Sequence, residues 1–447
     1  MSGRADTVRT MSFARNASST ALTQVVRTFL GLGLAVLLAR WLSEADRGIY
    51  AVVATLALFC DQLSQLGMRM AVIYRMSQRP ESRPRAVGAA LELTLVAFAV
   101  LALLAALCVD PLRERFLLGA DRAFVYLALV LAAADLLSGL GDAIARGIDR
   151  FDLRNADQMA ISLVTLAATW VSLVVFQSGL LGLLAAIAGA RLATLLVFGA
   201  LTLRRSGIDL APDPRELRES LRFGTKGHLQ TLLTRLHERA DVMLMAALRV
   251  DPAQIAVYAI AVGVIDRLQV VPDSISSALL PKLATLSPVE MGPYTARVTR
   301  HLVFWVALSG IALAAVAPFG VPLLFGPKYA ASVLPLFVLL PATAMLAVRT
   351  VVSSYFVAVG KPGFNAKVQA LALAVNVALN LWVIPRFGIV GAAFASLVSY
   401  AVEAIATVAA FRGATRCGVG ETLVANRKDL APYLGHVRRL RARLGGA

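Results

Sequence analysis

The chain has 447 residues, of which 58% are hydrophobic and only 16% are charged, whereas soluble domains average about 45–50% apolar and about 25% charged residues. Its net charge is +17, yet the Lys and Arg residues lie between the apolar runs, where the positive-inside rule places them. The composition therefore excludes an ordinary soluble domain, and the charge pattern argues against a nucleic-acid partner.

Apolar runs of about 18–25 residues recur along the chain, long enough to cross about 30 Å of hydrocarbon as helices. Their length and Leu/Ala richness exclude the short alternating strands of a membrane barrel. We predict an all-α integral membrane protein of about twelve transmembrane helices, at residues 20–41, 49–67, 87–108, 124–141, 159–176, 180–203, 226–248, 254–280, 298–324, 332–357, 366–384 and 390–411.

The distribution of Lys and Arg also predicts the orientation, with both termini in the cytoplasm, because the basic residues then gather in the inside segments. The N-terminus lacks the short apolar core of a cleavable signal. The predicted parts are a cytoplasmic N-terminus (1–19), a first six-helix lobe (20–203), a cytoplasmic amphipathic connector (204–225), a second six-helix lobe (226–411) and a basic cytoplasmic tail (412–447). The basic tail suits either the anionic inner leaflet or plain solvation.

An internal repeat relates the two predicted lobes. The segment GIYAVV at 48–53 matches AVYAIA at 256–261, and SGLLGLLAA at 178–186 matches FGIVGAAFA at 387–395, at a nearly constant offset of about 208 residues. Six spans separate equivalent points, so the halves share one orientation and form a parallel repeat. Parallel repeats are typical of transporters that move two lobes around a central site near the bilayer midplane.

Charged residues remain within the apolar spans, where each costs about 2.5–3.5 kcal/mol at a helix centre on insertion scales. The acidic ones are candidates for ion coupling or for ion pairing, and the basic ones for binding an anion in a central lumen. The candidate acids are Asp61, Asp135, Asp241 and Asp266, and the candidate bases are Arg27, Arg191, Arg235, Arg239 and Arg349. Snorkelling near a helix end or an intramembrane ion pair is the alternative for each.

Arg235 and Arg239 are four residues apart and share one helical face, about 14 and 20 Å into their span at 1.5 Å per residue. Two arginines at that depth predict either an aqueous cavity with an anion or ion pairs with Asp241 or a neighbouring helix. Arginine suits phosphate because its planar fork donates two parallel hydrogen bonds. A lumen of this kind favours a pyrophosphate and disfavours cationic drugs.

The sequence carries no constellation typical of an enzyme. The four histidines, at 228, 237, 301 and 436, form no metal-binding spacing, and no P-loop motif is present. Glu44 and Asp46 invite comparison with a metal-dependent glycosyltransferase, but a helix-capping surface turn explains them more simply. We therefore predict a transporter that is not an enzyme and that uses no metal or other cofactor.

Several segments resemble the Wzx-type flippases of O-antigen and exopolysaccharide biosynthesis, in the polysaccharide branch of the multidrug/oligosaccharidyl-lipid/polysaccharide exporter superfamily. The resemblance covers nearly all of residues 12–412, with one departure at Arg47, where an aromatic residue is expected. The segments that carry it include ARWLSEADRGIY at 39–50, QLGMRMAVIYR at 65–75, ARGIDRFDLRN at 145–155, LFGPKYAAS at 324–332 and NVALNLWVIPRFGIVGAAFASLVS at 376–399.

The resemblance implies a V-shaped, two-lobe exporter of the bacterial inner membrane. It would flip an undecaprenyl-pyrophosphate-linked oligosaccharide from the cytoplasmic to the periplasmic leaflet, working beside a polysaccharide polymerase and export machinery. A multidrug exporter of the same superfamily is the nearest alternative. A lipid II flippase would carry two further C-terminal helices, and a polymerase or ligase would need a large periplasmic loop.

Overall fold

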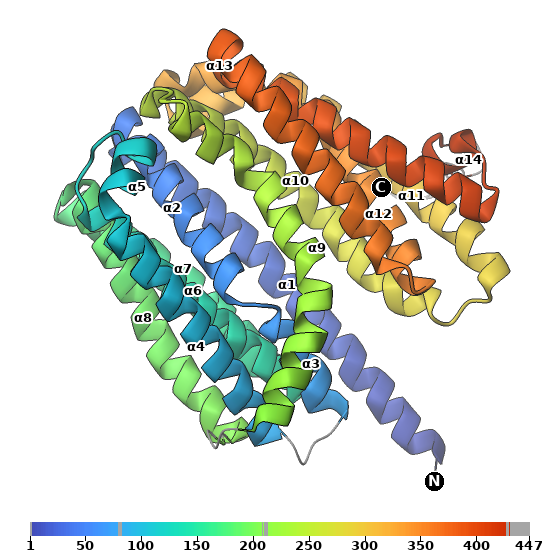
Figure 1. The fold of residues 1–447 in the computed structure, drawn as a ribbon. Helices are drawn as coiled ribbons and strands as arrows, with labels where there is room; N and C mark the ends of the chain where they lie inside the picture. Colours follow the sequence, from blue (N-terminus) through green and yellow to red (C-terminus); the bar gives the residue numbers. More distant parts are fainter. Residues whose placement is uncertain (1, 79–82, 208, 210–212, 426–428, 430–447) are drawn as a thin grey trace, which may run out of the picture. The chain divides into compact units, whose positions relative to one another are not determined.

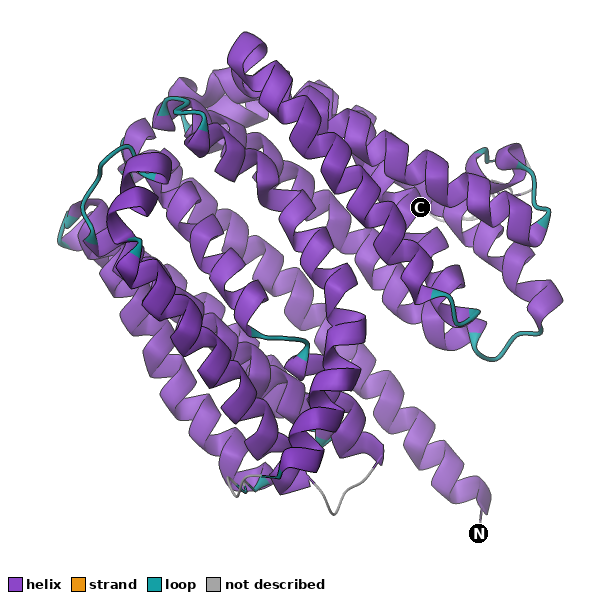
Figure 2. Ribbon diagram, in the orientation of Figure 1, coloured by secondary structure: helices purple, strands orange, loops and turns teal. Residues whose placement is uncertain are grey.

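The computed structural model describes residues 2–78, 83–207, 209, 213–425 and 429, which contain helices and no strand (Figure 2). This part of the chain is an all-α membrane protein, as predicted. The helices in chain order are α1 (Ser2–Trp41), α2 (Glu44–Ser64), α3 (Met68–Gln78), α4 (Arg83–Leu107), α5 (Val109–Phe116), α6 (Ala123–Gly147), α7 (Phe151–Trp170), the π-helix η2 (Val171–Val175), α8 (Gly179–Ser206), α9 (Pro214–Ala247), α10 (Pro252–Leu283), α11 (Pro288–Phe325), the 3₁₀ helix η3 (Pro327–Ser332), α12 (Val333–Ala358), α13 (Pro362–Thr415) and α14 (Val419–Leu423).

Nine helical segments of the described chain are long and apolar enough to cross a membrane, or ten if the bent pair α2–α3 is one span. Their outer faces carry large exposed apolar side chains, such as Leu103 and Leu104 on α4 and Leu196 on α8. Contiguous apolar surface of this kind indicates contact with lipid. The protein therefore crosses the membrane several times, and the predicted count of twelve is not established.

Two helices explain much of the difference in count. α13 is a single 54-residue element that contains both predicted spans 366–384 and 390–411, and Gly388, with a φ of 56°, interrupts its helical backbone. α9 contains all but the last residue of the predicted span 226–248 but is too polar to be counted by hydropathy. Its cap is Asp213, whose side chain accepts from the Arg215 and Glu216 amides, and Pro214 occupies the first turn. Part of the predicted connector is therefore helical.

The second span is bent where α2 meets α3. The two helices differ in direction by 47°, and Leu66 and Gly67 at the break have φ values of 46° and 77°. A Cβ on Gly67 would lie 2.2 Å from the carbonyl oxygen of Gly224 in α9. Glycine is needed here both for the left-handed backbone and for the close approach of α9.

The chain divides into two compact units. The first comprises Met1–Ile260, Val321–Ser332 and Asn380–Ile389, and the second comprises Ala261–Gly320, Val333–Leu379 and Val390–Ala447. In the first unit, α6 packs against α2, α3 and α8, α7 packs against α1, and α9 packs against α2, α3 and α4 (Figure 1). Its core includes Met68, Val72 and Met76 of α3, together with Leu140 and Ile144 of α6.

The second unit has two apolar clusters. In one, Leu279 and Leu283 of α10 contact Leu302 of α11 and Val351 of α12. In the other, α12, α11 and the last turns of α13 meet around Tyr355, Phe356 and Phe411. The ring centroids of Tyr355 and Phe411 are 5.1 Å apart at an interplanar angle of 90°, the edge-to-face geometry that aromatic pairs prefer.

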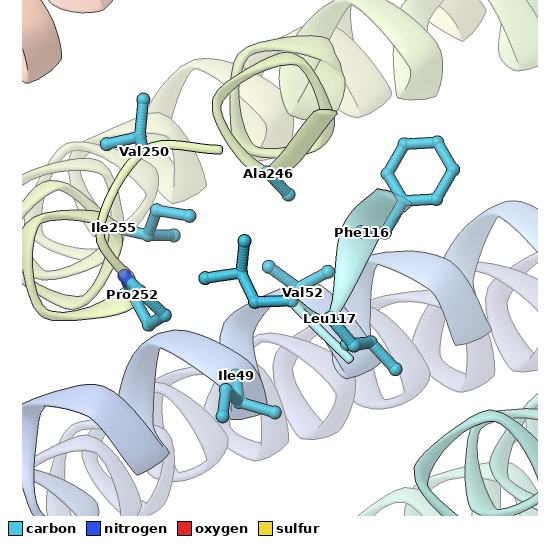
Figure 3. Close-up of a pocket in the computed structure, with 9 residues that line it drawn as sticks. Ile49, Val52, Phe116, Leu117, Ala246, Val250, Pro252 and Ile255 are labelled. Carbon is cyan, nitrogen blue, oxygen red and sulfur yellow. The ribbon is translucent and has the colours of Figure 1, made fainter. Parts of the chain in front are cut away.

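Close backbone packing also joins α2 to the α9–α10 turn within the first unit. A Cβ on Gly48 would lie 1.8 Å from the carbonyl oxygen of Pro252. Beside this contact, apolar side chains of α2, α5, α9 and α10 converge on a cavity of about 10 Å³, as Figure 3 shows. A cavity of this size and lining is too small and too apolar for a ligand. It marks a tightly packed end of the unit.

Candidate functional site

An intramembrane ion pair joins the two arms of the α2–α3 break. Arg69 of α3 pairs with Asp61 of α2 at 2.5 Å, and the Asp61 side chain is only 6% exposed. The guanidinium also donates to the backbone carbonyl of Asp135 in α6 at 3.0 Å. It lies over Gly139 of α6, where a Cβ would come 2.2 Å from its Cζ atom. Glycine at 139 therefore makes the space that Arg69 occupies.

The same helix carries a second pair, because the Asp135 carboxylate accepts from Arg191 of α8. Asp135 thus receives Arg69 at its backbone carbonyl and Arg191 at its side chain. The result is a polar chain through four membrane helices, from Asp61 to Arg69 to Asp135 to Arg191. The predicted candidates Asp61, Asp135 and Arg191 come together here, each with a partner of opposite charge.

Arg27 of α1 has a different environment. Its Nε donates to the Ser162 hydroxyl of α7 at 3.4 Å, and its Nη1 donates to the Gln24 side chain at 3.5 Å. Within the described chain, its guanidinium thus bonds only to neutral groups, through long contacts. The apolar part of α1 begins at Ser19, and Arg27 lies eight residues further on. At a rise of 1.5 Å per residue, Arg27 is about 12 Å along this apolar part.

The face of α7 that receives Arg27 is polar over several turns. Asn155, Ser162 and Thr169 recur every seven residues and so share one helical face. Asn155 hydrogen-bonds Ser19 and Thr20 of α1 at 3.2 and 3.4 Å. The hydroxyl of Thr169, which is fully buried, makes no hydrogen bond in the structure. The α1–α7 contact therefore offers hydroxyl and amide groups beside Arg27, whose side-chain hydrogen bonds among the described residues go to Ser162 and Gln24.

The predicted cluster on α9 is arranged partly as ion pairs. Arg235 is exposed and pairs with Glu238 of its own helix at 2.9 Å. Asp241 is 4% exposed and accepts from the Tyr258 hydroxyl of α10. Arg239 is half-buried one turn beyond Arg235. Arg235 therefore forms an ion pair, which was the alternative to anion binding. Its partner is Glu238, whereas the sequence suggested Asp241 or a neighbouring helix.

The second unit holds the remaining candidates. Arg349 of α12 lies 3.6 Å from the Glu403 carboxylate of α13, and its Nη1 donates to Gln369 at 3.3 Å. Nearby on α13, the Asn376 amide donates to the Ser399 hydroxyl at 3.2 Å. Asp266 of α10 is exposed, and its neighbour Arg267 donates to the Gly263 carbonyl. Arg349 and Asp266 both belong to the second unit, on α12 and α10.

Sequence reasoning missed Arg69 because the second span was predicted to end at residue 67, which placed Arg69 in a cytoplasmic loop. The bend lets the span continue through α3. The one local signal was the Leu66-Gly67 pair, since glycine inside an apolar run often marks a break. Ser162 and Gln369 were also missed, because neutral polar residues in a span give no charge signal.

A cavity of about 440 Å³ lies between α11 and α12 in the second unit. Its lining is apolar apart from Thr343, whose hydroxyl donates a hydrogen bond to the Leu340 carbonyl at 2.6 Å. This cavity therefore has no group suited to an anionic head group. In the described part of the chain, no cluster of three or more His, Cys, Asp or Glu residues could hold a metal ion.

Comparisons with known proteins identify the family of the chain. The polysaccharide biosynthesis protein family matches residues 13–287. The probable flippase AglR of Haloferax volcanii is 23% identical over 393 residues, which cover 86% of this chain and 80% of that protein. Both findings agree with the prediction of a transporter rather than an enzyme.

Solved structures show the same fold. The lipid II flippase MurJ, in an inward closed conformation, has a TM-score of 0.73 at 11% identity, over 89% of each chain. An inward-facing multidrug resistance MATE transporter of the MOP superfamily has a TM-score of 0.71 at 16% identity, over 87% of this chain and 94% of that one. The chain therefore shares its fold with these two solved transporters, and it belongs to the polysaccharide biosynthesis protein family, as its resemblance to the Wzx-type flippases predicted.

Proposed function

We propose that the protein flips a polyprenyl-pyrophosphate-linked oligosaccharide from the cytoplasmic to the periplasmic leaflet of the bacterial inner membrane, with both termini in the cytoplasm. The product would serve O-antigen or exopolysaccharide synthesis by a polymerase and export machinery. Family membership and the similarity to a probable flippase support the substrate class. Alternating access through a cationic lumen is the proposed mechanism.

The observation that carries the proposal is that the Arg27 guanidinium makes only long hydrogen bonds to neutral side chains among the described residues. An incoming pyrophosphate would replace two long bonds to neutral groups, whereas at Arg191 or Arg349 it would have to break an ion pair. Charge-assisted bonds from arginine to phosphate are about twice as strong as neutral ones and are often bidentate. Arg27 is therefore the first ligand that we assign to the pyrophosphate.

The hydroxyl and amide groups around Arg27 fit the same substrate. A sugar–pyrophosphate junction presents hydroxyls beside the anion, and Ser162 and Thr169 lie on one face of α7 beside α1. In the proposed cycle, Arg235 and Arg239 receive the head group after Arg27. Arg235 can do so only by leaving Glu238, and both are on the same helix, three residues apart.

Purified protein in lipid vesicles with radiolabelled undecaprenyl-pyrophosphate-linked N-acetylglucosamine tests the proposal. Flipping is measured as the fraction of lipid that a membrane-impermeant lectin can reach over time. Loss of a charge-assisted bond costs about 1.5–3 kcal/mol, so Arg27→Ala should slow flipping at least about tenfold. Arg27→Lys should retain part of the rate because lysine keeps the charge but loses the fork.

The matched control is Arg249→Ala, which removes an exposed arginine from the α9–α10 turn and should leave the rate unchanged. Wild-type flipping by Arg27→Ala at normal protein abundance would remove Arg27 from the site. Efflux of a cationic dye by vesicles that do not flip the lipid would instead support the multidrug alternative.

A further inference from the structure

Three cations of the first unit hold two distant loops together at one end. Arg40 lies in the last turn of α1, and its Nε donates to the backbone carbonyl of Leu324 at 3.0 Å. Its Nη2 donates to the carbonyl of Leu323. These carbonyls belong to the last turn of α11, where helix carbonyls lack intrahelical partners and carry partial negative charge. A side chain of α1 thus caps α11.

The converse contact is also present. Lys328 of η3 follows the end of α11, and its ammonium donates to the carbonyl of Leu42 at 2.8 Å. Leu42 directly follows the end of α1 at Trp41. Each of the two helices is therefore capped by a cation from the other chain segment. The two segments are about 285 residues apart in sequence, so this exchange is tertiary rather than local.

Arg47 completes the contact from the start of α2. Its guanidinium carbon lies 5.0 Å from the ring centre of Tyr329 and 5.9 Å from that of Phe325, within the range of a cation–π interaction. Arg47 is 6% exposed and Tyr329 is 0% exposed. Arg47, the residue that departs from the sequence expected of the first loop, is therefore buried against the aromatic ring of Tyr329 in η3.

We propose that Arg40, Arg47 and Lys328 form an exit latch, which closes the outer end of this unit on backbone carbonyls and aromatic rings and opens when a pyrophosphate takes over its cations. All three lie at or just beyond the ends of two predicted spans, 20–41 and 298–324, which run outward in the predicted topology. We therefore expect them at the periplasmic face. The proposal rests on the proposed function, which supplies the pyrophosphate.

The chemistry of the contacts favours exchange. Arg40 and Lys328 donate to neutral carbonyls and are exposed on the surface, so an anion can reach them. A phosphate oxygen is a stronger acceptor than a carbonyl and can engage the arginine fork with two bonds. Binding of the anion and closure of the latch therefore compete for the same donors, and arrival of the head group would release the loops.

The test uses the full-length protein in nanodiscs, with the three native cysteines replaced and a single cysteine introduced as Ser332→Cys. Ser332 is fully buried beside Tyr329, and its hydroxyl donates to the Val257 carbonyl at 2.7 Å. The measurement is its rate of reaction with a membrane-impermeant maleimide. We expect inorganic pyrophosphate to raise this rate at least fivefold, and sulfate at equal ionic strength to leave it unchanged.

Arg40→Ala and Lys328→Ala should each raise the rate without pyrophosphate, whereas the control Arg249→Ala should not. Equal rates with and without pyrophosphate would overturn the latch, even if Arg40→Ala labels faster. Flipping in vesicles with no effect of pyrophosphate on labelling would leave the proposed function intact and remove the latch. Faster labelling without flipping would support the latch and count against the proposed function.

Discussion

Asp61 and Arg69 form an ion pair that spans the break between α2 and α3. The carboxylate belongs to the first arm of the bent helix and the guanidinium to the second. The pair therefore fixes the direction of one arm relative to the other. It also connects the break to α6, because Arg69 donates to the Asp135 carbonyl.

Asp61→Asn should destabilise the protein, because Arg69 would keep its charge at a site from which it cannot move freely. Removing one partner of a buried pair costs about 3–5 kcal/mol. Since the Arg69 side chain is 24% exposed, we expect a smaller cost of about 1–3 kcal/mol. The measurement is the midpoint of thermal unfolding in detergent.

The double variant Asp61→Asn/Arg69→Gln should recover part of the loss, since neither charge is then left unpaired. Independent, additive effects of the two substitutions would show that the two residues do not stabilise the break together.

The apolar spans and their all-α character could be predicted from sequence, because length and hydropathy are local properties of a segment. The break at Gly67 could not, because its cause is the backbone of Gly224 on another helix. For the same reason, the position of Arg69 inside a membrane span could not be predicted, because it depends on that break.

The candidate arginines were recognisable from their charge, but their partners were not. Nothing in the local sequence indicates that Arg191 meets Asp135 on α6 or that Arg349 meets Glu403 on α13. Such contacts depend on which helices pack together. The placement of Arg235, Arg239 and Asp241 as substrate or coupling groups therefore stays a prediction, as do the lobe boundaries at 203 and 226.

Gly48→Ala should lower the abundance of the protein in the membrane. The added Cβ would lie 1.8 Å from the Pro252 oxygen, so backbone must shift, and overpacking of this kind costs about 1–3 kcal/mol or more. The matched control is Gly141→Ala, since a Cβ at that helical position meets nothing within 4 Å. Alanine there should be neutral or stabilise the protein by up to about 1 kcal/mol. Equal abundance of the two variants, measured by immunoblot, would contradict the close contact.

The orientation can be tested with single cysteines in a cysteine-free background. Cys108 must be replaced first because it is exposed. Glu114 on α5 and Arg205 on α8 are both exposed, and the positive-inside rule places them outside and inside, respectively. Glu114→Cys should react with a membrane-impermeant thiol reagent in spheroplasts, and Arg205→Cys only after permeabilisation. The opposite pattern would invert the topology and would place the exit latch on the cytoplasmic face.

Glu403→Gln tests whether Arg349 stabilises the second unit or binds substrate. The Glu403 side chain is 4% exposed and the Arg349 side chain 17% exposed, so the substitution leaves a largely buried guanidinium without its carboxylate. We expect a loss of about 3 kcal/mol, seen as a lower unfolding midpoint and lower abundance. The control, Glu114→Gln, removes an exposed carboxylate and should change neither.

Arg349→Ala/Glu403→Ala should recover part of the stability, because it removes both charges at once. If Arg349 were instead a ligand of the pyrophosphate, Glu403→Gln would free its fork for the anion. Abundance would then stay normal and flipping would stay the same or become faster. Normal stability of Glu403→Gln together with faster flipping would therefore support Arg349 as a ligand of the pyrophosphate rather than as a structural partner of Glu403.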